Sequence, residues 1–97
     1  MSTEAIKEQI KKNKSEISKR FHVKEIGLFG SYVRNEQTKR SDLDILVDFA
    51  KPIGWDVVDL QEYMQELLGV KVDLVLKKGI VRNKRLWKLI KDEVVYV

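Results

Sequence analysis

The chain has 97 residues, the size of one small domain spanning 1–97, and it contains no cysteine, which excludes disulfide bonds, thiolate chemistry and cysteine-based zinc sites. No segment reaches the roughly 20 apolar residues of a membrane span or has the pattern of a signal peptide, so we expect a cytoplasmic protein without a membrane partner. The net charge of +4 is unevenly distributed, because residues 25–76 carry ten acidic and five basic side chains between basic flanks, and such a central acidic cluster favours cation binding.

The first half of the chain predicts a helix followed by two strands. Apolar residues recur at helical spacing from Thr3 to about Arg20, which indicates an amphipathic helix. The segment 24–31 predicts a buried strand that ends in a turn at Gly30 and Ser31. Apolar and polar residues then alternate over 41–49, which predicts a strand with one acidic face.

The second half predicts a helix, a strand and a further helix. An apolar stripe over 57–68 indicates a second amphipathic helix, which Gly69 ends. A strand at 70–76 precedes a basic helix over 82–91, and the apolar tail after it predicts a short edge strand. The expected fold class is therefore α/β of the α+β kind, a small mixed sheet with helices packed on it.

Two carboxylates lie on the acidic face of the 41–49 strand. Because side chains alternate along a strand, Asp42 and Asp44 point the same way with their Cα atoms about 7 Å apart, a spacing at which they can share one divalent cation or bridge two. The same pattern also fits an ordinary charged strand surface. Asp48 lies on this face too, about 13 Å from Asp44, and is interpreted as surface charge.

A third carboxylate, Asp73, interrupts the apolar strand at 70–76. Burying a carboxylate is costly unless it is paired or bound to a metal, so a cation shared with Asp42 and Asp44 is one interpretation. The alternative is that Asp73 faces water beside Lys71. Gly30 and Ser31 likewise allow two interpretations, a backbone cradle for phosphate at a helix N-terminus or an ordinary turn with a helix cap.

Taken together, these motifs resemble one known family. The segments GSYVRN and SDLDILV, followed by the strand-borne Asp73, are similar to the GSxxRG and SDxDxxV pattern of minimal nucleotidyltransferases of the DNA polymerase β-like superfamily. The resemblance implies the palm fold of that superfamily and a transfer from ATP that depends on two Mg²⁺ ions. It assigns catalysis and metal binding to Asp42, Asp44 and Asp73, and phosphate binding to Gly30, Ser31, Arg34 and Ser41.

Two residues of the motif carry open questions. Arg34 matches the arginine of the family and is either a phosphate ligand or a structural partner of an acidic residue. Asn35 replaces the usual glycine, and asparagine tolerates a left-handed backbone better than most residues.

The family resemblance also implies a partner. Members are commonly encoded beside a HEPN-domain protein in toxin–antitoxin pairs, and they transfer AMP to a hydroxyl of that toxin, typically of tyrosine. The expected function is thus that of an adenylylating antitoxin, with nucleic acid not expected as a direct substrate. Two alternatives stay open: a non-catalytic module that neutralises its partner by binding alone, and a nucleic-acid binder that uses the two basic flanks, whose binding would be sensitive to salt.

Overall fold

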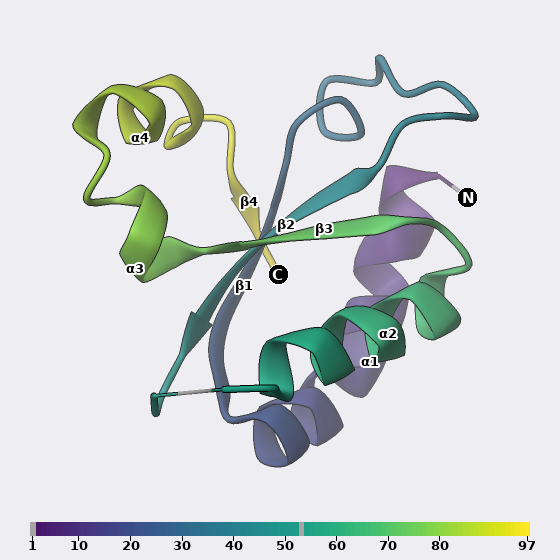
Figure 1. Cartoon of the computed structure of the whole chain (residues 1–97). Helices are drawn as coiled ribbons and strands as arrows, with labels where there is room; N and C mark the ends of the chain where they lie inside the picture. The colour runs from purple at the N-terminus through teal and green to yellow at the C-terminus, as the bar shows by residue number, and fades with distance from the viewer. Residues whose placement is uncertain (1, 53) are drawn as a thin grey trace.

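The computed structural model describes residues 2–52 and 54–97, in which helices and strands form a layered α/β arrangement (Figure 1). Each helix within these ranges is either too short or too polar to span a lipid bilayer. The elements are, in chain order, α1 (Thr3–Phe21), β1 (Val23–Phe29), β2 (Leu43–Phe49), α2 (Asp56–Leu68), β3 (Val72–Leu76), α3 (Lys77–Ile80), α4 (Lys84–Ile90) and β4 (Val95–Tyr96). The fold class expected from the sequence is confirmed.

The two long helices begin and end where local chemistry favours it. The Ser2 hydroxyl accepts the backbone N–H of Ala5 and caps the start of α1. His22 ends this helix with a left-handed backbone at φ 56°. Gly69 ends α2 in the same conformation, and its N–H donates to the Gln65 carbonyl at 2.8 Å.

The four strands form one mixed sheet in the order β3-β2-β1-β4. Strand β1 pairs antiparallel with both β2 and β4, whereas β2 and β3 are parallel. A parallel pair needs a crossover connection, which α2 supplies. In the β2–β3 register Asp44 lies opposite Asp73, so the fold brings two of the predicted carboxylates together.

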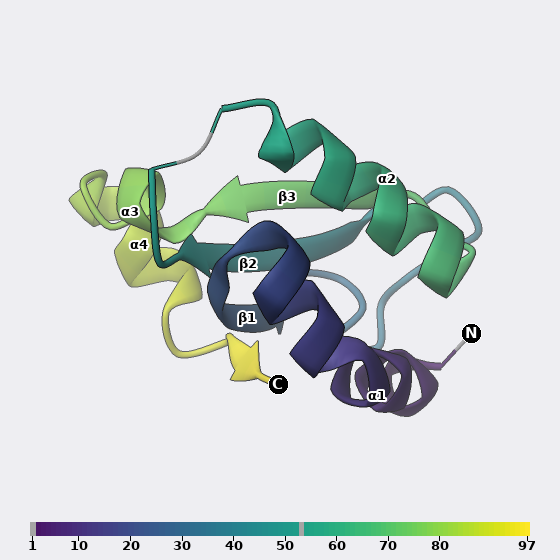
Figure 2. The ribbon, with the colours of Figure 1, turned by 90° about the horizontal axis from the view of Figure 1, so that it is seen from below.

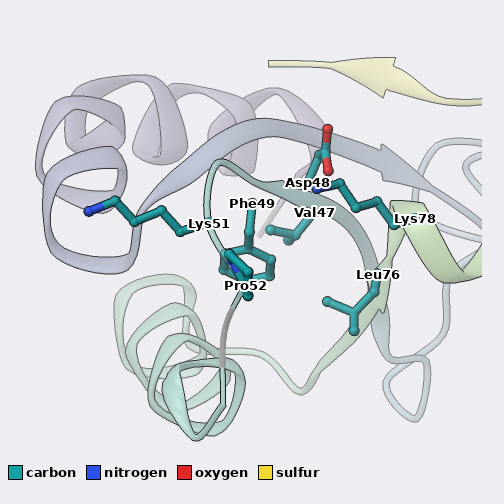
Figure 3. Close-up of a pocket in the computed structure, with 7 residues that line it drawn as sticks. All are labelled: Val47, Asp48, Phe49, Lys51, Pro52, Leu76 and Lys78. Carbon is teal, nitrogen blue, oxygen red and sulfur yellow. The ribbon is translucent and has the colours of Figure 1, made fainter.

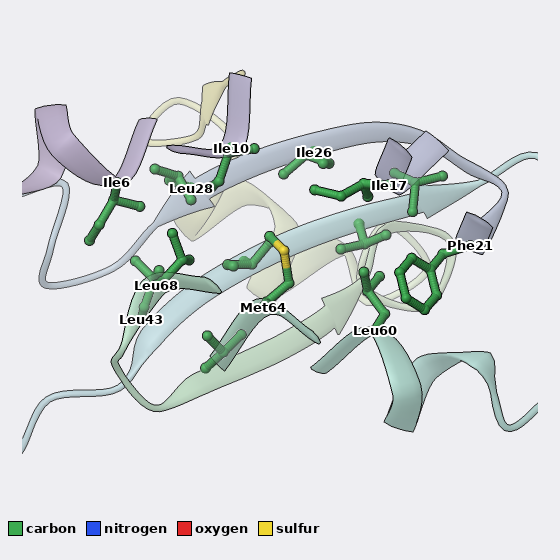
Figure 4. Packing of buried hydrophobic residues seen from close by; sticks show 14 of the residues in the cluster. Ile6, Ile10, Ile17, Phe21, Ile26, Leu28, Leu43, Leu60, Met64 and Leu68 are labelled. Carbon is green, nitrogen blue, oxygen red and sulfur yellow. The ribbon is translucent and has the colours of Figure 1, made fainter. Parts of the chain in front are cut away.

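Helices α1 and α2 cover one face of the sheet and enclose the main core (Figure 2 and Figure 4). The apolar face of β2 points into this core, as its alternating sequence predicts. Burial of each large side chain stabilises the fold by about 1.5–3 kcal/mol. The most completely buried members are Ile6, Ile10, Ile17, Leu28, Leu43, Ile45 and Leu60.

The C-terminal segment ends at the edge of the sheet, where β4 pairs with β1. Gly27 of β1 lies between two residues that face the core, so its missing side chain would point to the opposite face of the sheet. A Cβ there would lie 2.5 Å from Cγ1 of Val94, which shows that the Val94 side chain packs directly over Gly27. The edge strand expected in the tail is present, and the missing side chain of Gly27 leaves the room that Val94 fills.

Two local predictions differ from the structure. The short helix α3 was not expected, because it has four residues and includes Gly79, and it follows β3 without a connecting loop. The helix considered after Ser31 does not form. Residues 31–35 are instead a series of turns, in which the Gly30 carbonyl accepts the N–H groups of Val33 and Arg34.

Candidate functional site

Gly30 joins β1 to the turns and lies directly against Asp44. Its φ of 83° lies in the left-handed region, which glycine adopts more readily than other residues. A Cβ on this residue would lie 2.1 Å from Oδ2 of Asp44, so the carboxylate occupies the space that the missing side chain leaves. Asn35, four residues after Ser31, has φ 58°, which agrees with the left-handed tolerance expected of it.

The three predicted carboxylates lie at the same end of β2 and β3. Asp44 and Asp73 are register partners on neighbouring parallel strands, whose backbones lie about 4.8 Å apart. Asp42 comes two residues before Asp44, just ahead of the strand. Asp44 is half-buried, whereas Asp42 and Asp73 are exposed. The cost of burial therefore does not explain Asp73, and its water-facing position matches the second interpretation of the sequence.

The electrostatics of this acidic cluster centre on Asp44. The pKa of its carboxyl is raised from 3.8 to about 6, chiefly by burial and then by the negative charges of Asp73 and Asp42. Arg34 opposes this rise, and Glu93 adds to it. The ionised form of Asp44 is thus disfavoured by its surroundings, and a cation placed beside it would relieve the repulsion.

Arg34 is held by two carboxylates. Its Nε donates to Oε2 of Glu36 at 3.0 Å, and its Nη1 donates to Oε1 of Glu93 at 2.5 Å. The hydrogen bond to Glu93, followed by the one to Glu36, raises the pKa of the guanidinium above its usual value. In this structure Arg34 is therefore a partner of acidic residues, one of the two roles that its sequence position allowed.

Glu93 is the site residue that the sequence did not reveal. Its other oxygen, Oε2, accepts the backbone N–H of Gly30 at 3.1 Å. The register of β1 with β4 pairs Gly27 with Tyr96 and Leu28 with Val95, and its continuation brings Glu93 opposite Gly30. The one available signal was an acidic pair, Asp92 and Glu93, between a basic helix and an apolar strand, and it has meaning only once that register is known.

The two predicted serines take different positions around this cluster. Ser31 is half-buried in the turns, where its carbonyl accepts the Glu36 N–H at 2.9 Å. The Ser41 hydroxyl accepts the Thr38 N–H at 2.9 Å and so closes the turn that leads into Asp42. Ser41 also lines a polar cavity of about 600 Å³, together with the basic side chains of Lys39, Arg40 and Lys71.

The suitability of the cluster for a metal ion follows from its charges. No group of three His, Asp or Glu side chains in the part of the chain that the structure describes converges closely enough to enclose a metal ion. Mg²⁺ in proteins is usually held by one or two carboxylates, with substrate phosphates and water as its other ligands. Asp44 and Asp73 lie next to each other, and neighbouring negative charges repel the ionised form of Asp44. The two residues therefore fit that mode of Mg²⁺ binding.

A separate cavity of about 230 Å³ lies at the other end of β2 (Figure 3). Asp48 lines it and is half-buried, so it lies apart from Asp42 and Asp44, as interpreted from the sequence, but is less exposed than an ordinary surface charge. Its Oδ1 is buried and has no hydrogen-bond partner in residues 2–52 and 54–97. The cavity is lined by side chains of Val47, Asp48, Phe49, Lys51, Pro52, Leu76 and Lys78, so it includes none of the three clustered acids.

Comparisons with known proteins identify the family. The family model of the nucleotidyltransferase domain matches residues 7–97. Protein adenylyltransferase MntA of Thermococcus cleftensis is 44% identical over 98 residues, which cover 100% of this chain and 97% of that protein. A relative from Methanocaldococcus jannaschii, assigned by name to the protein adenylyltransferases, is 43% identical over 93 residues, which cover 95% of this chain and 94% of that protein.

The fold leads to the same group. A solved structure assigned by name to the minimal nucleotidyltransferases matches with a TM-score of 0.80 and 30% identity, covering 98% of this chain and 95% of that one. Because the family model and the relatives extend over nearly all of the sequence, the chain belongs to the nucleotidyltransferase family and is a nucleotidyltransferase enzyme.

Proposed function

We propose that this enzyme transfers AMP from ATP to a hydroxyl group of a partner protein, releasing pyrophosphate. The observation that carries the proposal is the placement of Asp44 beside Asp73 and against Gly30, with Asp42 just ahead of the same strand. The names of the relatives, which are protein adenylyltransferases, support AMP as the group and a protein as the acceptor. We place the reaction in the cytoplasm, within one catalytic domain over 1–97.

In this reaction the acceptor oxygen forms a bond to the α-phosphorus while the bond to the bridging oxygen of pyrophosphate breaks. Asp42, Asp44 and Asp73 would hold two Mg²⁺ ions, which supply positive charge for the triphosphate and for the attacking and leaving oxygens. Asp73 is exposed, and in this proposal its carboxylate accepts the proton that the acceptor hydroxyl loses. The reaction thus uses carboxylates alone as proton acceptors.

We propose that the phosphates of ATP bind to basic side chains and to the turn near the acidic cluster. Gly30 and Ser31 would present the turn to the terminal phosphates, and Arg34 would donate to them. The cavity beside Ser41 adds positive charge from Lys39, Arg40 and Lys71, which suits a polyanionic substrate. The Ser41 hydroxyl, already bonded to Thr38, contributes by fixing the approach to Asp42.

We further propose a HEPN-domain toxin as the acceptor protein, with a tyrosine hydroxyl as the acceptor group and an antitoxin role for this enzyme. The basis is the family resemblance of its sequence motifs. The alternative is neutralisation of the same partner by binding alone. The two differ in whether the acidic cluster is needed, so the experiment must separate transfer from complex formation.

The test combines the purified protein with the HEPN protein encoded beside it, Mg²⁺ and each nucleoside triphosphate in turn. Intact mass spectrometry then measures the mass of the partner. We expect a gain of adenylyl groups with ATP and none with the Asp42→Asn/Asp44→Asn double variant. Asp48→Asn is the matched control, because it removes the same charge from the same strand face outside the cluster.

The outcomes distinguish the two proposals. Loss of transfer in the double variant, with transfer kept in Asp48→Asn, supports the enzyme proposal. A partner whose mass never changes, although a stable complex forms and its activity is neutralised, refutes adenylylation and favours binding alone.

A further inference from the structure

Glu93 links the C-terminal segment to the turns that follow β1. One carboxylate oxygen accepts the Gly30 N–H at 3.1 Å, and the other accepts from Nη1 of Arg34 at 2.5 Å. The Glu93 side chain is 19% exposed, whereas that of Arg34 is 47% exposed. A carboxylate that is largely shielded and accepts two hydrogen bonds, one of them from a charged group, holds both of its partners firmly.

The two bonds fix different parts of the same turn. The bond to Gly30 N–H sets the orientation of the peptide that enters the left-handed residue, whose Cα lies against the carboxylate of Asp44. The bond to Arg34 sets the direction of the guanidinium, which Glu36 holds at Nε as well. Nη2 is the remaining nitrogen, and it has no hydrogen-bond partner in the part of the chain that the structure describes.

We propose that Glu93 is a positioning residue that orients Gly30 and Arg34 for the phosphates of the nucleotide. This inference rests on the proposed function, because it assumes that the triphosphate binds at these turns. Glu93 does not itself contact the nucleotide, and its effect passes through the backbone of Gly30 and the guanidinium of Arg34. The Nη2 group is thereby kept in place as a donor before the nucleotide arrives.

The proposal also explains why a carboxylate is tolerated so near an acidic cluster. Glu93 raises the pKa of Asp44 through its negative charge, whereas Arg34 lowers it. Pairing Glu93 with Arg34 places opposite charges next to each other, which limits that cost. The pair therefore holds the Gly30 turn in place and leaves Nη2 of Arg34 as a directed donor, while its opposite charges limit the net charge beside Asp44.

The test measures MgATP affinity by calorimetric titration, without any acceptor protein. Glu93→Gln keeps the shape of the side chain and removes its charge, and we expect about three- to tenfold weaker binding from the loss of one charge-assisted hydrogen bond. The matched control is Asp92→Asn, the neighbouring exposed acid, which should bind like the unmodified protein. The unfolding midpoint in urea confirms that each variant is folded.

A double-variant cycle separates positioning from general support of the fold. If Glu93 acts through Arg34, Glu93→Gln should weaken MgATP binding much less in an Arg34→Ala background than in the unmodified protein. Fully additive effects, or unchanged affinity of Glu93→Gln, would overturn the positioning role. Both substitutions lie at one partly exposed ion pair, so they probe the same contact from its two sides.

A readout without nucleotide keeps this inference distinct from the proposed function. In ¹⁵N NMR spectra of the nucleotide-free protein, we expect Glu93→Gln to shift the Gly30 amide and the Arg34 Nε resonances, whereas Asp92→Asn leaves both in place. Unshifted resonances overturn the inference. If the unmodified protein binds no MgATP while these shifts are observed, it is the proposed nucleotide site that fails, and the assignment of Glu93 to phosphate positioning fails with it.

Discussion

Replacing Asp44 with asparagine should make the metal-free protein more stable while abolishing transfer. The Asp44 carboxyl has its pKa raised from 3.8 to about 6 in the folded protein. At about 1.4 kcal/mol per pKa unit, a shift of this size corresponds to about 3 kcal/mol of unfavourable interaction with the ionised form. Because Asp44 is half-buried, solvent screening reduces the expected gain from Asp44→Asn to about 1–2 kcal/mol.

The sign of the effect depends on pH. The folded-state pKa lies above the unfolded value, so the stability that the protonated carboxyl provides is present at low pH and is lost as pH rises through about 6. Asparagine does not titrate, so the gain should be full at about pH 7.5 and mostly absent at about pH 4. No side-chain hydrogen bond of Asp44 is found in the described ranges, so the amide should not disrupt one.

Urea unfolding followed by circular dichroism, with a chelator present, measures this difference at both pH values. Asp59→Asn is the control, because Asp59 is an exposed acid in the first turn of α2, where its loss removes a favourable helix-dipole interaction and should give no gain. An Asp44→Asn protein that is no more stable than the unmodified one at about pH 7.5, or that gains equally at both pH values, would refute the electrostatic argument.

Three further predictions use the same stability measurements. Mg²⁺ at about ten times its dissociation constant should raise the free energy of unfolding by about 1.4 kcal/mol. The stability of the Asp42→Asn/Asp44→Asn variant should not change, and equal effects on both proteins would place the ion elsewhere. Gly30→Ala should lower the free energy of unfolding by about 1–3 kcal/mol and weaken MgATP binding in titrations. The reason is that residue 30 has a φ of 83° and that a Cβ there would lie 2.1 Å from Oδ2 of Asp44. An unaffected variant would show that the turn rearranges freely. Met64→Ala should cost about 2–5 kcal/mol in urea unfolding because Met64 is 1% exposed, with MgATP affinity measured under folded conditions unchanged.

Much of the fold was predictable because the main elements carry a clear hydrophobic period. The alternation in β2 separates the core face, with Leu43 and Ile45, from the face that carries Asp44. The helical stripe of α2 is equally regular, and Gly69 marks its end. These elements lie over the main core, where burial of apolar side chains decides the conformation, so the sequence pattern and the structure agree there.

The parts that could not be predicted depend on contacts between distant segments. Helix α3 is too short to show a period, and the turns after Ser31 are held by hydrogen bonds to Gly30 rather than by helical propensity. Glu93 reaches Gly30 only because β4 pairs with β1 in one particular register. The strand and the spacing of Asp73 predicted that it belongs to the site. The cost of burying a carboxylate does not support that prediction, because Asp73 is exposed.

The bond between Gly30 and Glu93 joins positions that are 63 residues apart, and it makes the site a late product of protein synthesis. The acids of β2 and β3 leave the ribosome well before the segment that carries Glu93 and β4. A nascent chain therefore has its three aspartates before it has a fixed turn at Gly30, and the contact between such distant positions carries an entropic cost of loop closure. Nucleotide binding should accordingly reach its full affinity only once this bond has formed, which would make the affinity a reporter of correctly folded molecules.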